Sequence, residues 1–384
     1  MSDDRPVGVP QLSRGRLFLR FLRFGALAWG GPVAQIAMIR QELVEEERWI
    51  SRERFNRVLA VYQMLPGPEA HELCVYFGML ARGRIGGVLA GLGFMLPGFI
   101  LMFVLSWIYV TYGIGSPTFA AVFAGCQAAV VALIVRAVHR IGQHALLDRW
   151  LWGIALGTAV ASALGVNLLL VLLVAGVAYA VVRRAIQPSG LSAVLMLPAT
   201  AAAAAAVASH PSLLALFRSG LRTGLLTFGG AYTAIPFLQH DAVGAGGWMT
   251  NAQFLDGLAL SGTLPAPLII FSTFVGYLGG GSLGAVVLTA GVFLPAFAFT
   301  LIGHDVVERL VENRGAHAFL DGITAGVVGL IAATALALFR EAVGTVPALV
   351  VFALALLLTY RWRARAAVAG IMVGAGVIGW LAFR

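Results

Sequence analysis

The sequence predicts an all-α membrane protein that crosses the bilayer many times and contains two copies of one unit, inverted relative to each other. Of its 384 residues, 60% are hydrophobic and only 11% are charged, whereas a soluble protein carries about a quarter charged residues. The mean hydropathy is +0.90. Apolar runs of roughly 20 residues, long enough to cross a bilayer, recur along the whole chain.

A recurring pattern of Gly, Trp and Pro reveals the two copies. The first runs from Gly25 to Pro68, begins GALAWGGP and ends QMLPGP; the second runs from Gly224 to Pro267, begins GLLTFGGA and ends SGTLPAP. The Gly-Gly, Trp and Pro-x-Pro positions keep one offset, because 230 − 31, 248 − 49 and 267 − 68 all equal 199. This register indicates a duplication, and each copy carries a glycine break and a proline break inside apolar sequence.

The chain divides accordingly into four parts. We expect a polar cytoplasmic tail at 1–16, a first repeat at 17–184, a linker with an extra transmembrane span at 185–211, and a second, inverted repeat at 212–384. Each repeat begins with two broken apolar segments and continues with four uninterrupted spans. The predicted spans are 86–111, 118–138, 150–165 and 166–182 in the first repeat, and 284–303, 318–339, 347–360 and 366–382 in the second.

Arginine distribution predicts the orientation. The 26 basic residues are all arginines, and arginines collect in cytoplasmic loops of membrane proteins. Loop 40–57 holds five arginines, while its equivalent in the second repeat, 239–256, holds none. Conversely, 111–117 is uncharged, whereas the corresponding second-repeat connection carries Arg309 and Arg314. The repeats therefore face opposite sides of the cytoplasmic (inner) membrane, with the N-terminus in the cytoplasm. The same rule explains the net charge of +9 without nucleic-acid binding.

The breaks predict an internal polar site. Both loops that flank 58–80 are predicted to be cytoplasmic, so this segment should enter the membrane and return; the first broken segment is either a second re-entrant hairpin or a kinked span. Irregular backbone at membrane depth persists only inside protein or beside a water-filled cavity. Half-helices that end there direct partially positive N-termini toward the site, which favours an anion bound between the repeats. The alternative is that the glycines only allow tight helix packing.

The predicted substrate-binding residues are the breaks and the polar groups next to them. They are Arg23, Gly30, Gly31, Gln63, Pro66, Gly67, Pro68, Arg222, Gly229, Gly230, Ser261, Thr263, Pro265, Ala266 and Pro267. Arg23 and Arg222 differ by 199, and a guanidinium suits a tetrahedral oxyanion; the alternative is an arginine that reaches the lipid headgroups. The side chains of Gln63, Ser261 and Thr263 would bind the oxyanion or instead repair the broken helices.

Five residues are predicted to couple or gate transport. Glu42 and Asp241 also differ by 199, and each either binds a proton or cation or pairs with an arginine. Glu69, His71 and Glu72 follow the first proline break directly; ionisable groups at membrane depth are usually functional, although acids also favour a helix's first turn. The sequence HELCV does not match the zinc motif HExxH, because its fifth residue is valine. No metal and no cofactor are predicted, and Cys74 and Cys126 fit small buried side chains.

These motifs resemble the chromate ion transporter (CHR) family in its two-domain long form. The first repeat carries FLRFGALAWGGPVAQIAMIRQELV, QMLPGPEA and GFMLPG; the second carries FGGAYTAIPFLQHDAVGAGGWMTNAQFLDGLALSGTLPAP and GVFLPAF. The resemblance covers nearly the whole chain. Two positions depart from the family pattern: Trp29 replaces an aromatic residue before Gly-Gly, and Ala266 stands where the family has glycine, although alanine disfavours positive φ.

The resemblance implies a secondary transporter that exports chromate and confers chromate resistance. The alternative substrate is sulfate or another oxyanion, with uptake as a further direction. A remote alternative, an intramembrane enzyme, lacks a recognisable catalytic set, and no nucleotide-binding GxxxxGK[ST] motif occurs. The expected partners are chromate, with sulfate as a related anion, and the lipid bilayer. The oligomeric state is not readable from the sequence, and a homodimer is compatible with it.

Overall fold

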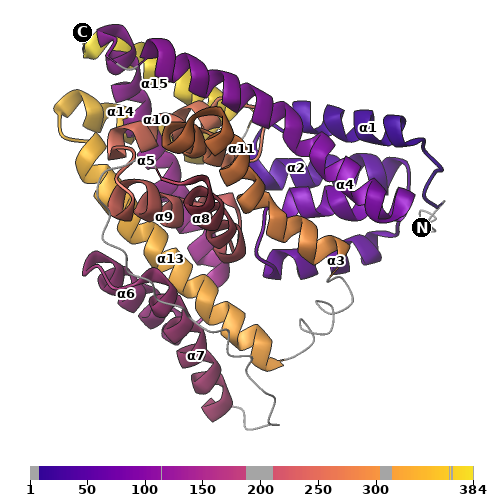
Figure 1. Ribbon diagram of the computed structural model, residues 1–384. Helices are drawn as coiled ribbons and strands as arrows, with labels where there is room; N and C mark the ends of the chain where they lie inside the picture. The colour runs from indigo at the N-terminus through magenta and orange to yellow at the C-terminus, as the bar shows by residue number, and fades with distance from the viewer. Residues whose placement is uncertain are drawn as a thin grey trace.

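A computed structural model describes residues 8–113, 115–186, 211–302, 314–362, 364 and 366–383. All regular secondary structure in these residues is helical, which confirms the all-α prediction (Figure 1). Four helical segments in this part of the chain are long and apolar enough to cross a membrane: Glu69–Gly113, Pro117–Ala145, Leu268–Leu301 and His317–Ala342. The extra span expected at 192–209 lies outside the described residues.

The two repeats have the same order of helices. The first contains α1 (Arg14–Ala26), α2 (Gly31–Arg40), η1 (Gln41–Glu46), α3 (Arg52–Met64), α4 (Glu69–Ile108), η2 (Tyr109–Gly113), α5 (Pro117–Ala145), α6 (Arg149–Ala163) and α7 (Leu168–Ile186). The second contains α8 (Leu213–Leu226), η3 (Ala231–Ala234), α9 (Ile235–Gln239), η4 (His240–Ala245), α10 (Asn251–Gly262), η5 (Leu268–Ile270), α11 (Phe271–Leu301), α13 (Arg314–Ala342), α14 (Val346–Arg361) and α15 (Ala367–Ala382).

Local backbone geometry repeats as well. The π-helical segments η1 and η4 begin 199 residues apart (240 − 41). Helices α4 and α11 are interrupted at Gly83 (φ 59°) and Gly281 (φ 60°), which are 198 residues apart (281 − 83). The duplication inferred from sequence is therefore present in the fold.

The interruption of α4 is a reversal of direction. A Cβ atom added at Gly78 would lie 2.4 Å from the carbonyl oxygen of Gly86, so the arms on either side of Gly83 pack closely against each other. Helix α3 contacts the first arm of α4, where Arg54 donates a hydrogen bond to the Tyr76 hydroxyl, so the two form a hairpin around the proline break at 65–68.

The first broken segment is also a hairpin. Helix α1 has 13 residues, about 20 Å at 1.5 Å per residue, which is less than the ~30 Å apolar thickness of a bilayer. After the glycine break the chain returns along α1, because Glu42 of η1 forms ion pairs with Arg20 and Arg23 of α1. The structure thus favours the re-entrant alternative over a kinked span. Helix α1 begins at Arg14, earlier than the expected apolar start, because Ser13 caps it by accepting a hydrogen bond from the Arg16 amide.

The last helices of each repeat pack on the opposite repeat. Helices α6 and α7 contact α13, while α14 and α15 contact α5, and Figure 1 shows α6 and α7 beside the orange α13. The approach is close: a Cβ at Gly125 would lie 2.1 Å from the Ala375 carbonyl oxygen, and one at Gly322 would lie 2.5 Å from the Ala175 carbonyl oxygen. Because the exchange is reciprocal, the two halves form one interlocked body in which α4 also contacts α11 and α5 contacts α13.

Candidate functional site

The proline break of the first repeat meets the glycine break of the second. The amide of Gly67 donates a hydrogen bond to the carbonyl oxygen of Thr227, at 2.8 Å. Gly67 has φ 152°, a conformation that favours glycine. Thr227 ends α8 directly ahead of the break at Gly229 and Gly230. Two of the four predicted breaks, one from each half, therefore lie together inside the protein.

The other two breaks have different hydrogen bonds. Ala28 and Ala266 are equivalent to Thr227 and Gly67 (227 − 28 and 266 − 67 both equal 199). The amide of Ala266 donates to the carbonyl oxygen of Leu264 in its own loop, at 2.9 Å. The carbonyl oxygen of Ala28 accepts from the side chain of Gln35, at 2.9 Å. Each of these two backbone groups forms its hydrogen bond within its own repeat. The hydrogen bond between Gly67 and Thr227 therefore has no counterpart at the equivalent positions.

Residue size is matched where each proline break packs on a helix of the opposite repeat. A Cβ added at Gly67 would lie 3.2 Å from the Cβ of Ala296, and one added at Gly98 would lie 2.5 Å from the Cβ of Ala266. Gly98 and Ala296 are themselves equivalent (296 − 98 = 198). Each proline break thus packs on the same position of the opposite repeat, with one glycine and one alanine in each contact. This explains how the second break accommodates alanine.

A cluster of buried polar side chains lies beside Gly67. We name Tyr62, His71, Glu72 and Thr300 the Glu72 cluster. A Cβ added at Gly67 would lie 2.8 Å from Glu72 Oε1, and the Tyr62 hydroxyl faces both Glu72 and Thr300. Both carboxyl oxygens of Glu72 are buried and form no hydrogen bond among the described residues, while the Tyr62 and Thr300 hydroxyls face each other.

Such an unpartnered carboxyl group is unusual, because buried polar atoms normally have hydrogen-bond partners. His71 packs edge-on against Phe293 and Phe297 of α11, with ring centroids 5.0 and 4.7 Å apart, so an apolar wall closes one side of the cluster. The Glu72 cluster is therefore the strongest candidate for a ligand or proton site in the described part of the molecule.

Two arginines of α5 supply positive charge to this region. The charges of Arg136 and Arg140 both act on Tyr232, which follows the second glycine break, and the charge of Arg140 also acts on Glu69 at the start of α4. The sequence analysis did not place them at the site. The sequence feature that could have identified them is the spacing of the two arginines. They are four residues apart, about one helical turn, near the end of an apolar helix.

The predicted arginines and acids of the glycine hairpins pair with each other. Arg23 binds Glu42, and Arg222 binds Asp241. A second donor completes each pair, since Arg20 lies 2.9 Å from Glu42 and Ser219 donates to Asp241 at 2.6 Å. Positions 20 and 219 are also equivalent (219 − 20 = 199). This is the arginine-pairing alternative, and it joins the two arms of each hairpin.

Acids also neutralise arginines in the loop after α2. Burial would raise the pKa of Glu45, but hydrogen bonds from Arg40 and Arg52 and their charges outweigh it and hold the pKa below its usual value. Glu47 behaves in the same way: burial is outweighed by Arg20 and Trp49, and its pKa is lowered. These carboxylates therefore remain ionised. They neutralise arginines that could otherwise bind an anion.

The remaining predicted residues are dispersed. Ser261 donates to the carbonyl oxygen of Leu268 at 3.0 Å, and Thr263 donates to that of Leu260 at 2.7 Å, so both repair broken backbone. The side chain of Gln63 is exposed. The prolines and glycines differ in burial: Pro66, Pro68, Pro267 and Gly230 are buried, Pro265, Gly31 and Gly229 are half-buried, and Gly30 is exposed.

One further buried carboxyl, that of Asp256, was not predicted. Asp256 of α10 accepts hydrogen bonds from Tyr109 at 2.7 Å and Gln127 at 2.8 Å, which ties α10 to η2 and α5. Its equivalent in the first repeat is Arg57 (256 − 57 = 199), and that charge reversal is the signal that could have drawn attention to it.

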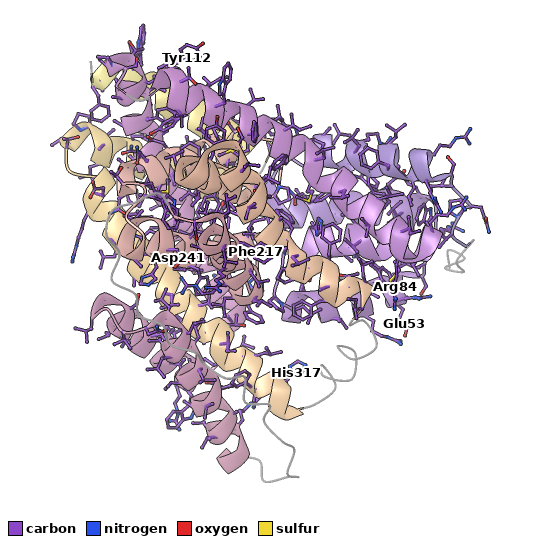
Figure 2. The ribbon with its side chains drawn as sticks, viewed as in Figure 1. Glu53, Arg84, Tyr112, Phe217, Asp241 and His317 are labelled. Carbon is purple, nitrogen blue, oxygen red and sulfur yellow. The ribbon has the colours of Figure 1, made fainter. Side chains whose placement is uncertain are left out.

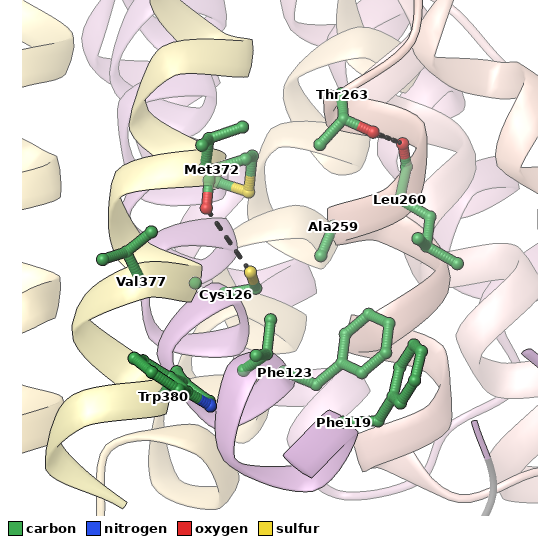
Figure 3. A pocket seen from close by; sticks show the side chains of 12 residues that line it. Phe119, Phe123, Cys126, Ala259, Leu260, Thr263, Met372, Val377 and Trp380 are labelled. Carbon is green, nitrogen blue, oxygen red and sulfur yellow. Dashed lines mark hydrogen bonds between the residues drawn. The ribbon is translucent and has the colours of Figure 1, made fainter. Parts of the chain in front are cut away.

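The cavity in Figure 3 does not suit an anion. It has a volume of about 450 Å³ and lies between α5, α10 and α15. Its lining contains Phe119, Phe123, Met372 and Trp380 but no charged side chain. The thiol of Cys126 contacts the carbonyl oxygen of Met372 there, at 3.5 Å. An oxyanion would lose its hydration in this cavity without gaining charged partners.

Comparisons with known proteins identify the family. The model of the family described as Chromate transporter matches residues 15–211 and 214–380. The chain is 57% identical to the chromate transport protein of Pseudomonas aeruginosa, over 97% of this chain and 94% of that protein. It is 30% identical to a probable chromate transport protein of Synechococcus elongatus, with 92% and 91% covered. It is also 30% identical to the chromate transport protein of Cupriavidus metallidurans, with 98% and 94% covered.

No solved structure matches the chain. The family model covers both repeats, and the relatives align over nearly their full length. The chain therefore belongs to the chromate transporter family of multi-pass membrane proteins.

Proposed function

We propose that this protein is a secondary transporter that exports chromate across the cytoplasmic membrane and thereby confers chromate resistance. Its relatives are named as chromate transport proteins, which favours transport over catalysis. The observation that carries the proposal is the meeting of two helix breaks from opposite repeats, at Gly67 and Gly229–Gly230, beside a buried carboxyl group without a hydrogen-bond partner among the described residues.

This junction has the parts that an oxyanion needs. Helix α4 begins at Glu69, and the unpaired amides of a helix N-terminus carry partial positive charge. At Gly230, with φ of 116°, an added Cβ atom would meet no other atom within 4 Å, so a bound ion could approach the backbone there. Arg136 and Arg140 would draw the dianion toward the junction. In this proposal the ion pairs of Arg23 and Arg222 fix the hairpins that present the breaks.

The membrane potential supports export. At 100 mV, inside negative, each elementary charge is worth ~2.3 kcal/mol. A dianion leaving the cell would therefore gain about 4.6 kcal/mol. Export by this route needs neither ATP nor a second substrate.

Uptake of labelled chromate into everted membrane vesicles tests the proposal. Vesicles with the protein should accumulate chromate in response to an imposed potential, positive inside the everted vesicle. Absence of uptake would contradict the proposal. If unlabelled sulfate competes as well as unlabelled chromate, the site accepts tetrahedral dianions in general and sulfate becomes the alternative substrate.

Replacement of Gly67 by alanine should abolish most transport. Alanine disfavours φ 152°, at a cost of about 1–3 kcal/mol, and its Cβ would press on Glu72 Oε1. The matched control is Ala266→Gly at the equivalent break, which adds no atom and should retain transport. Initial rates in everted vesicles, normalised to protein amount, measure the difference. Equal rates for Gly67→Ala and wild type would show that this break is not in the substrate path.

We further propose that the two repeats have opposite orientations, with loop 40–57 in the cytoplasm. Glu53 is highly exposed, with 82% of its side chain accessible, at the edge of the molecule (Figure 2). Gly244 lies in the exposed loop of the second repeat that corresponds to 40–57.

Single-site labelling measures this orientation. A membrane-impermeant maleimide should label Glu53→Cys only in everted vesicles and Gly244→Cys only in intact cells. The native Cys74 and Cys126 are buried and should give little background. Labelling of both sites from one side would contradict the inverted arrangement.

A further inference from the structure

Glu72 is a fully buried acid whose surroundings contain no cation partner. It lies one helical turn after the proline break, with 0% of the residue exposed, and no described residue forms an ion pair or hydrogen bond with it. Two ionisable groups lie near it: Tyr62 of α3, which also faces Thr300 of α11, and Glu69 at the start of its own helix. The preceding residue, His71, packs against Phe293 and Phe297 of α11. Arg140 of α5 acts on Glu69.

Such a carboxyl group is neutral in this state. An isolated ionised carboxylate in an apolar interior is very costly, and the group takes up a proton instead. The neutral group has an O–H donor. Glu72 Oε1 lies next to Gly67, whose amide is bonded to Thr227 just ahead of the glycine break of the second repeat. Protonated Glu72 can therefore donate to an oxyanion in the junction, whereas ionised Glu72 would repel a dianion at the same place.

We propose that Glu72 makes anion binding depend on a proton: the oxyanion enters the junction of Gly67 and Gly229–Gly230 when Glu72 is protonated, and loss of that proton expels it. This inference rests on the proposed function. Water supplies the proton to Glu72 before the anion binds, and the carboxylate returns it to water when the anion leaves. By linkage, a bound anion also strengthens proton binding at Glu72.

One consequence is a smaller electrical driving force. If the proton accompanies the dianion, the complex carries one net negative charge instead of two. The membrane potential then contributes ~2.3 kcal/mol per 100 mV, half the value for the free dianion.

Binding of chromate to the purified, reconstituted protein as a function of pH tests the inference. The wild type should lose affinity as Glu72 deprotonates, by up to tenfold per pH unit for one linked proton. The variant Glu72→Gln keeps a neutral donor of the same shape, so its affinity should stay near the low-pH wild-type value. Chromate itself exchanges a proton with water near neutral pH, but this affects all variants equally. Glu53→Gln, at an exposed position, should follow the wild type.

Three outcomes would overturn the inference: a Glu72→Gln profile that parallels the wild type, a folded Glu72→Gln protein that binds no chromate at any pH, or an absent infrared signal. That signal is the C=O stretch of a protonated carboxyl group, which should appear in the wild type without anion and vanish in Glu72→Gln. If Glu72→Gln does not fold, Glu72→Asp should shift the band. If the wild type shows the band but binds no chromate, the proposed function fails and the protonation of Glu72 stands.

Discussion

Replacement of Asp241 by asparagine is expected to destabilise the protein by about 3 kcal/mol, which is typical of breaking a buried ion pair. Asp241 is 8% exposed and binds both Arg222 and Ser219. Its removal would leave the half-buried guanidinium of Arg222 without an anion, and the Ser219 hydroxyl without its carboxylate acceptor. Thermal unfolding in detergent measures the loss of stability. Size-exclusion chromatography checks that the variant still elutes as a folded protein before heating.

The equivalent change in the first repeat provides the control. Glu42 has 23% of its side chain exposed. Of its two partners, Arg23 has 55% exposed, and Arg20, with 16% exposed, keeps its ion pair with Glu47, so neither arginine is left buried without an anion or water. Glu42→Gln should therefore cost no more than about 1 kcal/mol, as for other solvent-exposed pairs. The double variant Arg222→Gln with Asp241→Asn should recover part of the stability, because no uncompensated charge remains. Equal losses for Asp241→Asn and Glu42→Gln would contradict the difference in burial.

Gly98→Ala should destabilise the contact between α4 and the second proline break by about 1–3 kcal/mol, the usual cost of overpacking a core. The added Cβ would lie 2.5 Å from the Cβ of Ala266, much closer than two methyl groups can approach. Adding Ala266→Gly removes the opposing methyl and should restore stability. The double variant would carry the alanine on α4 instead of in the proline break and keep the total volume of the contact.

A double-mutant cycle by chemical unfolding tests this compensation. The coupling free energy between positions 98 and 266 should be about as large as the overpacking cost, because residues in contact do not contribute additively to the free energy of unfolding. Ala296→Gly, at the position equivalent to 98, should not rescue Gly98→Ala, because Ala296 contacts Gly67 and not Ala266. Rescue by Ala296→Gly would contradict the assigned contacts.

Features that follow from local pattern could be predicted from the sequence. The constant offset located the repeated breaks, and it matched Arg23 to Arg222 and Glu42 to Asp241; pairing of each acid with an arginine was one of two alternatives. Gly and Pro interrupt helices through their own backbone chemistry, so the hairpin at 65–68 was readable without tertiary information.

Contacts between the repeats could not be predicted. The offset says which residues are equivalent, but not that Gly67 would meet Thr227 of the other copy. Helical periodicity gives little help in a bilayer, because side chains that face lipid and side chains that face the core are both apolar. For the same reason, the packing of α7 on α13 left no visible pattern. Asp256 was overlooked because its partners Tyr109 and Gln127 lie far away in the sequence.

The glycine and alanine at the paired contacts have a consequence for the history of the chain. Two copies of the first repeat, placed as the halves are here, would set glycine against glycine and leave a gap the size of a methyl group at both contacts. Two copies of the second would set Ala266 against Ala296 and force two methyl groups into space that now holds one. Neither half is a good partner for itself. The duplicated unit has become two complementary parts, and substitutions at 67 and 296, or at 98 and 266, are constrained to change together.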